Sequence, residues 1–285
     1  MQESRSWLPP TGTLGTILEA TRRRLPTLDR AMAEAGLPSV APGTGFSLDY
    51  LPGSQPARLK QALVRETIAV IAEIKRRSPS KGELNGQLDA AAQAQAVERG
   101  GAAAISILTE PDFFGGSLDD LRAVRGAVSL PTLKKDFHVH EAQLFEARLA
   151  RASAILLIAR ALSPQELPRL VAHARRNQLE VVVEVRSADE LTRALDAGAD
   201  IIGVNSRNLE TLEIDPGVPE SLVPRIPADV VAIWESGVAS RADVERAAKF
   251  GADAVLVGSA LSRSTDPEAL VRNLAQVKRT GRPRG

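Results

Sequence analysis

Two opposite charges within an apolar run give the first indication of chemistry in this chain. The run Val70–Lys75 is typical of a buried strand, yet Glu73 and Lys75 stand near its end. Because successive side chains of a strand point to opposite faces, Glu73 and Lys75 share one side with Ile71. A buried charge is costly unless it is paired or used. The pattern therefore indicates either a structural ion pair or part of a reactive site.

The elements that must position these charges are apolar, β-branched runs, which predict strands. They are Val70–Lys75, Ala103–Thr109, Thr132–Phe137, Ala154–Arg160, Glu180–Val185, Ile201–Asn205, Val230–Ser236 and Ala254–Ser259. Helical segments separate most of them, and capping boxes at Ser163–Glu166 and Ser187–Glu190 mark two helix starts. Gly198 and Gly251 precede two of the strands, as expected of glycines that end a helix in the left-handed conformation. Such βα units, buried on both faces, predict an α/β fold, a closed (β/α)8 TIM barrel.

Polar residues at the ends of these runs form a second pattern. Barrel enzymes place their reactive groups at the C-terminal ends of the strands. By parity, the residues that can point to the barrel axis are Glu73, Lys75, Lys135, Glu184, Asn205 and Glu235, with Arg207 and Ser236 beside them. Together they supply acids, bases and hydrogen-bond donors in one partly desolvated pocket, where pKa values can shift. The clustering favours catalysis over an isolated ion pair.

Two glycine turns follow the last two predicted strands. Ser236-Gly237-Val238 and Gly258-Ser259-Ala260 stand where barrels of this kind often bind phosphate. Small residues let backbone amides approach an anion. The turns therefore predict a phosphorylated substrate, and the alternative is a pair of tight turns without a ligand.

Residues 1–60 lack a strand pattern and predict an N-terminal helical extension. Leu14–Gly36 is helical in pattern despite Pro26, and Pro38–Pro56 reads as a linker rich in Pro, Gly and Ser. The triplet Arg22-Arg23-Arg24 is expected to be a solvated face of the helix. We expect an extension that covers the barrel mouth at residues 1–60, the catalytic barrel at 61–279 and a basic tail at 280–285.

Composition excludes several classes of protein. Lys and Arg number 36 against 35 Asp and Glu, so a net charge of +1 gives no drive toward nucleic acid or an anionic membrane. The absence of cysteine excludes disulfides and thiolate nucleophiles. Met1–Pro10 has no apolar signal core, and no run approaches the roughly 20 apolar residues that cross a bilayer. We expect a monomeric, cytoplasmic protein with one barrel, since such barrels commonly take about 250 residues.

The motifs resemble those of the indole-3-glycerol phosphate synthase family. In chain order, they are Ile71-Ala72-Glu73-Ile74-Lys75, Ser78-Pro79-Ser80-Lys81-Gly82, Leu108-Thr109-Glu110 with Phe114 and Gly116-Ser117, Lys135-Asp136-Phe137, Glu184-Val185, Ile202-Gly203-Val204-Asn205-Ser206-Arg207-Asn208-Leu209 and Glu235-Ser236-Gly237. The resemblance spans Val70 to the region of Leu274. The N-terminal helix is similar to the segment that lies over the barrel mouth in the family, whereas Phe46–Ser54 fits less well.

The resemblance implies a reaction and a role for each matching residue. The family converts 1-(2-carboxyphenylamino)-1-deoxyribulose 5-phosphate into indole-3-glycerol phosphate, with loss of carbon dioxide and water, and needs no cofactor or metal. Lys135 matches the general acid at the sugar ketone, Lys75 the group that binds the carboxylate, and Glu184 the general base. Glu73 would hold the lysines, and Asn205 would orient the substrate. The remaining matches are Ser78, Gly237, Gly258 and Ser259 at or beside the phosphate, Arg207, Glu235 and Ser236 at other parts of the substrate, and Phe114 and Phe137 against the aromatic ring.

Three places depart from the family pattern. Trp234 is expected to pack toward the helix layer, because its parity is opposite to that of Glu235. His138 and His140 could suggest a metal, but no third ligand has a fitting spacing, so a solvated loop is expected. Arg151 stands where a glycine is usual, in a turn far from the chemistry.

Two other functions fit parts of the pattern. A related sugar-phosphate isomerase barrel would share the phosphate turns and release no carbon dioxide, but an enolisation does not need two lysines and two glutamates. A non-catalytic barrel would bind a ligand without turnover, and the set of Lys75, Lys135 and Glu184 argues against it. The site, rather than the fold, favours the synthase reaction.

Overall fold

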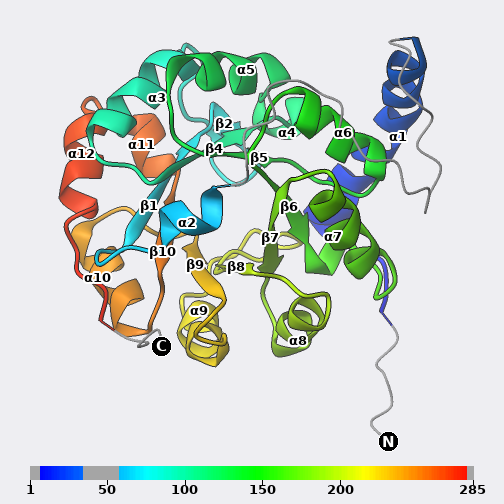
Figure 1. The fold of residues 1–285 in the computed structure, drawn as a ribbon. Coiled ribbons are helices and arrows are strands. Elements are labelled where there is room, and N and C mark those ends of the chain that lie inside the picture. Colours follow the sequence, from blue (N-terminus) through cyan, green and yellow to red (C-terminus); the bar gives the residue numbers. More distant parts are fainter. Residues whose placement is uncertain (1–6, 35–57, 281–285) are drawn as a thin grey trace, which may run out of the picture.

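A closed barrel of parallel strands, surrounded by helices, forms the centre of the protein (Figure 1). The computed structural model describes residues 7–34 and 58–280. The barrel strands are β1 (Ala69–Ile74), β4 (Ala104–Leu108), β5 (Thr132–Lys135), β6 (Ala154–Ile158), β7 (Glu180–Val185), β8 (Ile201–Asn205), β9 (Val231–Glu235) and β10 (Ala254–Val257). They lie around the barrel in sequence order, and β10 closes it by pairing with β1. The predicted α/β barrel is confirmed.

The helices form the outer layer of the barrel and its additions. They are α1 (Gly12–Glu34), α2 (Leu59–Leu63), α3 (Ala90–Arg99), α4 (Pro111–Phe114), α5 (Leu118–Ala127), α6 (Glu141–Leu149), α7 (Glu166–Arg176), α8 (Ala188–Asp196), α9 (Gly217–Leu222), α10 (Arg241–Lys249), α11 (Ser259–Arg263) and α12 (Pro267–Leu274). Short 3₁₀ turns lie at Ala159–Ala161 and Val223–Arg225, and a small hairpin joins β2 (Arg77–Ser78) to β3 (Gly82–Glu83). Sequence patterns did not predict this hairpin, because each of its strands has only two residues.

Burial of the strands on both faces explains why their sequences are apolar almost throughout. All residues of β1, β4 and β8 are buried, since helices cover one face and barrel side chains fill the other. Trp234 in β9 points to the helix layer, where its ring lies 6.2 Å from that of Phe250 at the end of α10. The packing expected for Trp234 is therefore confirmed.

Helix ends agree with the capping signals in the sequence. The Ser163 hydroxyl accepts from the Glu166 amide at 3.2 Å, and the Glu166 carboxylate accepts from the Ser163 amide at 2.8 Å. Before α8, Ser187 caps the Glu190 amide, but the Glu190 carboxylate accepts from the amide of Arg186 instead of Ser187. Gly198 and Gly251 are left-handed, with φ of 81° and 91°. Arg151 takes the same conformation in its turn, with φ of 61°, at the place where glycine was expected.

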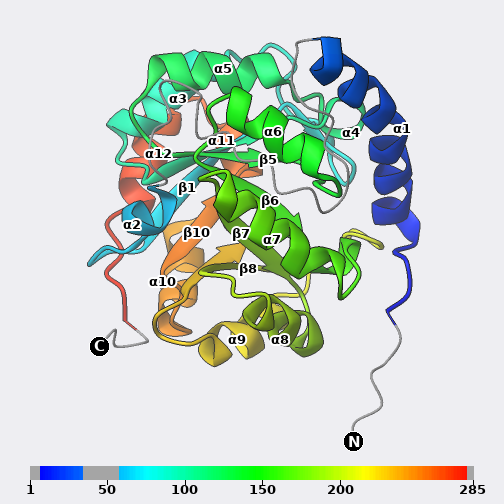
Figure 2. The same cartoon turned by 45° about the vertical axis from the view of Figure 1, so that its right-hand side comes forward.

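The helix α1 runs along one side of the molecule, beside α4 and α6 (Figure 2). Leu14, Ile17, Leu18 and Thr21 are buried, which is the i, i+3, i+4, i+7 spacing of one helix face. At the start of the helix, the Thr11 amide donates to Glu210 Oε1 at 2.7 Å. The predicted N-terminal helical extension is confirmed.

The division into residues 1–60, 61–279 and 280–285 stays a prediction. The expected linker at Pro38–Pro56, the poorly matching Phe46–Ser54 and the tail after Thr280 lie outside the described residues.

Two expectations about solvent-exposed arginine and histidine side chains are wrong. Arg22 and Arg23 are exposed as predicted, but Arg24 forms ion pairs with Glu110 and Asp112. The helix pattern cannot reveal this contact, because the partners belong to α4 and its N-cap, more than eighty residues along the chain.

The second error concerns His138, which is 1% exposed and does not lie in a solvated loop. Its Nδ1 lies 2.8 Å from the Leu156 carbonyl oxygen, so Nδ1 carries the proton and Nε2 faces Lys134 Nζ at 3.3 Å. Burial and the nearby Lys134 lower the pKa of His138 to about 3, which keeps the ring neutral. His140 caps α6 through the Ala142 amide. Within residues 7–34 and 58–280, no three acidic or histidine side chains are grouped to hold a metal ion.

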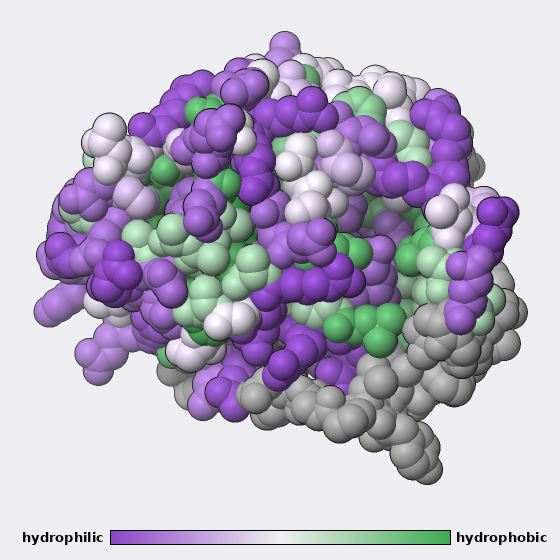
Figure 3. All heavy atoms as spheres, turned by 90° about the horizontal axis from the view of Figure 1, so that it is seen from above, coloured by the Kyte–Doolittle hydropathy of each residue, from purple (hydrophilic) through white to green (hydrophobic). Residues whose placement is uncertain are grey.

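The outer surface is largely hydrophilic on the face shown in Figure 3, where apolar side chains occur in small groups. Among the helices of the described ranges, none combines the length and apolar character that a bilayer span requires.

Candidate active site

A cavity of about 300 Å³ opens at the C-terminal ends of the barrel strands. Every site residue expected from the sequence lines it: Glu73, Lys75, Ser78, Phe114, Lys135, Phe137, Glu184, Asn205, Arg207, Glu235, Ser236, Gly237, Gly258 and Ser259. The lining also includes Thr13 and Ile17 of α1. The barrel thus collects these residues from most of its strands, as parallel strands that end at one mouth must do.

Lys135 lies at the centre of the charged part of the cavity. Its Nζ is 3.0 Å from Glu184 Oε2 and 2.8 Å from Glu235 Oε2. Burial by itself would lower the pKa of Lys135, but the carboxylates of Glu235, Glu184 and Glu73 outweigh burial and raise it above its ordinary value. Asn205 Nδ2 donates to Glu184 Oε1 at 3.0 Å and fixes that carboxylate. Lys135 is therefore an ammonium group that two carboxylates hold in place, and it carries a proton that it can donate.

The cavity holds more carboxylates than ammonium groups. Lys75 pairs with Glu73, and Lys135 is shared by Glu184 and Glu235. Burial raises the pKa of Glu235 from 4.5 to about 7, and the charges of Glu184 and Glu73 add to this, although Lys135 opposes them. Glu235 Oε1 has no hydrogen-bond partner among the described residues. Glu235 can therefore gain or lose a proton near neutral pH.

Two glycines make room for these carboxylates. A Cβ atom at Gly203 would overlap Glu235 Oε1, and one at Gly258 would overlap Glu73 Oε1 and lie 2.9 Å from Lys75 Nζ. Any larger residue would displace a charged group of the site. Gly258 was expected at the phosphate end, whereas the steric role of Gly203 was not recognisable from its motif.

Phe114 and Phe137 form an aromatic wall of the cavity. Their ring centroids are 6.0 Å apart, and the planes are tilted by 36°. Phe137 lies just beyond β5, where its amide donates to its neighbour Asp136 at 2.8 Å and its carbonyl accepts from Gln143 Nε2 at 2.9 Å. A flat apolar ring could lie against this wall.

Small residues and cations also line the cavity. Ser236 and Gly237 have left-handed backbones, with φ of 66° and 77°, and leave their turn open to the cavity. Lys81 and Arg263 are the cations of this group. Burial lowers the pKa of Lys81, and the positive charges of Arg263, Arg207 and Lys75 lower it further. Such a group of like charges suits a phosphate.

Sequence reasoning missed Lys81 and Arg263 as site residues. Lys81 belongs to the motif that follows β1, so its type and position could have identified it. Arg263 ends α11, and nothing in its local sequence separates it from an ordinary surface arginine.

Comparison with known proteins agrees with this geometry. The model of the family described as indole-3-glycerol phosphate synthase matches residues 48–274. A protein of that name from Kineococcus radiotolerans is 50% identical over 225 residues, which cover 77% of this chain and 82% of that protein. Another, from Micrococcus luteus, is 43% identical over 259 residues, which cover 91% of this chain and 95% of that protein.

Solved structures with lower identity show the same fold. A tryptophan synthase from M. tuberculosis, in an open form, is matched over 79% of this chain and 100% of that chain, with a TM-score of 0.59 and 19% identity. A 3-hexulose-6-phosphate synthase from Salmonella typhimurium is matched over 73% and 97%, with a TM-score of 0.58 and 17% identity. On the family match and the two relatives, the chain belongs to the indole-3-glycerol phosphate synthase family.

Proposed function

We propose that the cavity carries out the family reaction with Lys135 as its general acid. Family membership makes the protein a carboxy-lyase of tryptophan biosynthesis that acts on a phosphorylated small molecule. The reaction closes the five-membered ring of 1-(2-carboxyphenylamino)-1-deoxyribulose 5-phosphate and then releases carbon dioxide and water, which leaves indole-3-glycerol phosphate.

The observation that carries the proposal is the position of the Lys135 ammonium group between two carboxylates and near the aromatic wall. Ring closure turns the ketone carbon into a carbon that bears a hydroxyl group. The ketone oxygen gains negative charge as the aromatic ring attacks, and a proton from Lys135 Nζ neutralises it. The raised pKa of Lys135 keeps the group in its ammonium form at neutral pH, which is the form that can supply the proton.

The other charged residues take the later proton transfers and hold the substrate. Lys75 binds the substrate carboxylate, and its ion pair with Glu73 fixes its direction. Glu184 acts as the general base that restores aromaticity or helps expel water, while Asn205 orients it. Glu235 shares Lys135 with Glu184, so it completes the set that keeps the acid in place.

The two ends of the substrate bind to different residues of the cavity lining. Phe114 and Phe137 contact the aromatic ring. The phosphate lies by Ser78, Gly237, Gly258 and Ser259, where Lys81 and Arg263 add positive charge. Arg207 and Ser236 contact the sugar chain between them. The expected monomeric state and cytoplasmic location stay predictions.

The test is to add purified protein to the substrate in buffer with EDTA and to follow the appearance of indole fluorescence. Steady product formation supports the proposal. Lys135→Ala should lower kcat by at least about 100-fold with a modest loss of binding, because general acid catalysis contributes about 10²–10⁴-fold. Lys75→Ala should impair both kcat and KM. Lys249→Ala, at an exposed site on α10, is the matched control.

Two results would contradict the proposal. Near-normal turnover by Lys135→Ala would exclude Lys135 as the acid. Tight substrate binding by the unaltered protein without any product would favour a binding scaffold or a related enzyme that acts on another phosphate.

A further inference from the structure

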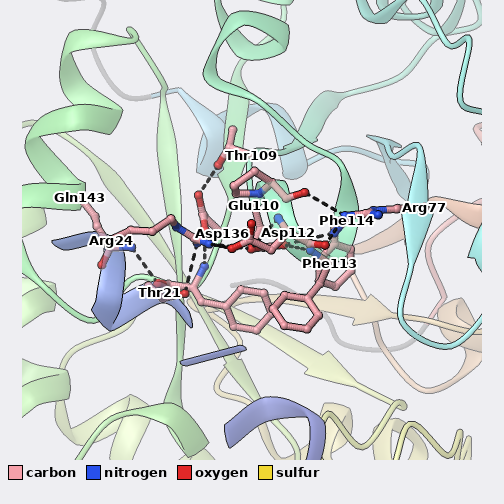
Figure 4. A network of polar contacts seen from close by, with 12 residues as sticks. Thr21, Arg24, Arg77, Thr109, Glu110, Asp112, Phe113, Phe114, Asp136 and Gln143 are labelled. Atoms are coloured by element: carbon pink, nitrogen blue, oxygen red, sulfur yellow. Dashed lines mark hydrogen bonds and ion pairs between the residues drawn. The ribbon is translucent and has the colours of Figure 1, made fainter. Parts of the chain in front are cut away.

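The short helix α4 carries Phe114 of the aromatic wall and depends on one side chain for its shape. Glu110 caps α4 by accepting from three successive amides (Figure 4). Its Oε1 accepts from Asp112 at 3.1 Å, and its Oε2 accepts from Phe113 at 2.7 Å and Phe114 at 3.2 Å. A single helical turn cannot hold itself together in water. The place of Phe114 is therefore set by the carboxylate of Glu110.

The Glu110 carboxylate is fully buried, with a side-chain exposure of 0%. A buried carboxylate is costly unless a cation and hydrogen bonds compensate it. Arg24 of α1 is that cation: its Nη1 lies 3.1 Å from Glu110 Oε1, and it also pairs with Asp112. Arg24 is partly buried, which reduces the screening of this interaction by water. The N-terminal helix thus supplies the charge that the cap of α4 requires.

A second contact holds α4 from the other side. Arg77 Nη2 donates to the Pro111 carbonyl at 3.1 Å and also to that of Asp112 (Figure 4). Gly115, with φ of 61°, ends the helix beside the Arg77 side chain. The helix α4 therefore lies between Arg24 and Arg77, so loss of the Arg24 contact leaves it free to shift on one side.

We propose that Arg24 and Glu110 are a positioning pair that sets the place of Phe114 for the aromatic ring of the substrate. This inference rests on the proposed function, in which that ring lies against Phe114 and Phe137. Arg24 touches neither substrate nor the reacting groups; it acts through Glu110 and α4. Its loss weakens binding of the aromatic part of a ligand and leaves phosphate binding unchanged, because Gly237, Gly258 and Ser259 follow β9 and β10, whereas α4 follows β4.

The experiment compares Arg24→Met with Arg23→Met, an exposed arginine on the same helix that gives the same change of charge. Steady-state kinetics and binding of indole-3-glycerol phosphate and of inorganic phosphate are measured for both variants. For Arg24→Met, we expect KM and the product Kd to rise about tenfold, the upper range for an aromatic contact. The Kd for inorganic phosphate should change less than about twofold by the same reasoning, and Arg23→Met should match the unaltered protein.

A double-mutant cycle with Phe114→Ala separates positioning from a general loosening of the fold. Because Arg24 acts through Phe114, Arg24→Met should add less than about twofold to the effect of Phe114→Ala on the product Kd. Arg24→Lys keeps the charge and should restore part of the affinity, which also provides a folded variant if Arg24→Met is unstable.

Three outcomes would overturn the inference. They are equal behaviour of Arg24→Met and Arg23→Met, an equal loss of phosphate and product binding, and full additivity with Phe114→Ala. If the unaltered protein formed no product, the proposed function would fail instead, while the two binding measurements would still decide the role of the pair.

Discussion

The buried carboxylates around Lys135 predict a specific pH dependence of stability, which Glu235→Gln should remove. Glu73, Glu184 and Glu235 lie around only two ammonium groups: Lys75 pairs with Glu73, and Lys135 is shared by Glu184 and Glu235. Glu235 is 1% exposed, and one of its oxygens has no hydrogen-bond partner among the described residues. Glutamine has nearly the same shape and neither binds nor releases a proton in this range.

The size and sign of the effect follow from the pKa of Glu235, which is raised from 4.5 to about 7. Between these values the folded protein keeps a proton that the unfolded chain has lost. The free energy of unfolding therefore falls as pH rises through this window, by up to about 1.4 kcal/mol per pH unit and about 3 kcal/mol in all. The contribution is fully present below about pH 4.5 and is lost above about pH 7. As pH rises through this window, the unfolding free energy of Glu235→Gln should increase by about 3 kcal/mol relative to that of the unaltered protein.

The assay is urea unfolding, followed by tryptophan fluorescence, at pH values from about 4.5 to about 8. The difference in unfolding free energy between Glu235→Gln and the unaltered protein is plotted against pH. Glu245→Gln, at an exposed carboxylate of α10, is the control for charge removal. A difference that stayed constant across this range would refute the reasoning, because Glu235 would then ionise as an ordinary carboxyl group.

The remaining predictions concern four other positions. Gly203→Ala should destabilise the protein by about 1–3 kcal/mol and reduce activity, because the new methyl group displaces Glu235. Gly126→Ala in α5 has open space around the new methyl group and should stabilise the protein by about 0.5–1 kcal/mol. Urea unfolding and the product assay check both variants. Arg151→Gly should raise the unfolding free energy by up to about 1 kcal/mol, since glycine relieves the left-handed strain, and a lower midpoint in urea would contradict this. The pKa of His138 is lowered to about 3, so its contribution to stability is present above about pH 6.5 and is lost as pH falls toward 3. Unfolding curves of His138→Gln should therefore show a weaker loss of stability in acid than those of the unaltered protein.

Local sequence predicted most of the fold because the barrel repeats one simple unit. Its strands are short apolar runs, and helix caps such as Ser163 and left-handed glycines such as Gly198 separate them. These signals depend on neighbouring residues only. Strand ends were less certain: Phe137 was assigned to a strand, but Asp136 binds its amide and turns the chain after Lys135.

The candidate site was predictable for a related reason. Parallel strands of a closed barrel all end at one mouth, so polar residues at those ends must come together. Lys135, Glu184 and Glu235 could thus be grouped without knowledge of any distance between them. Their roles in the reaction stay predictions.

The sequence by itself determined the type of fold, the family and the polar strand-end residues that meet in the cavity, because periodicity and motifs are properties of neighbouring residues. The tertiary structure alone decided which charges are paired and which are in excess. It showed that Arg24 of α1 binds Glu110 at the cap of α4, that His138 is buried and neutral, and that Gly203 makes room for Glu235. Pairing, burial and steric room depend on residues far apart in the chain, and their effect on pKa values and stability exists only once the fold brings those residues into contact.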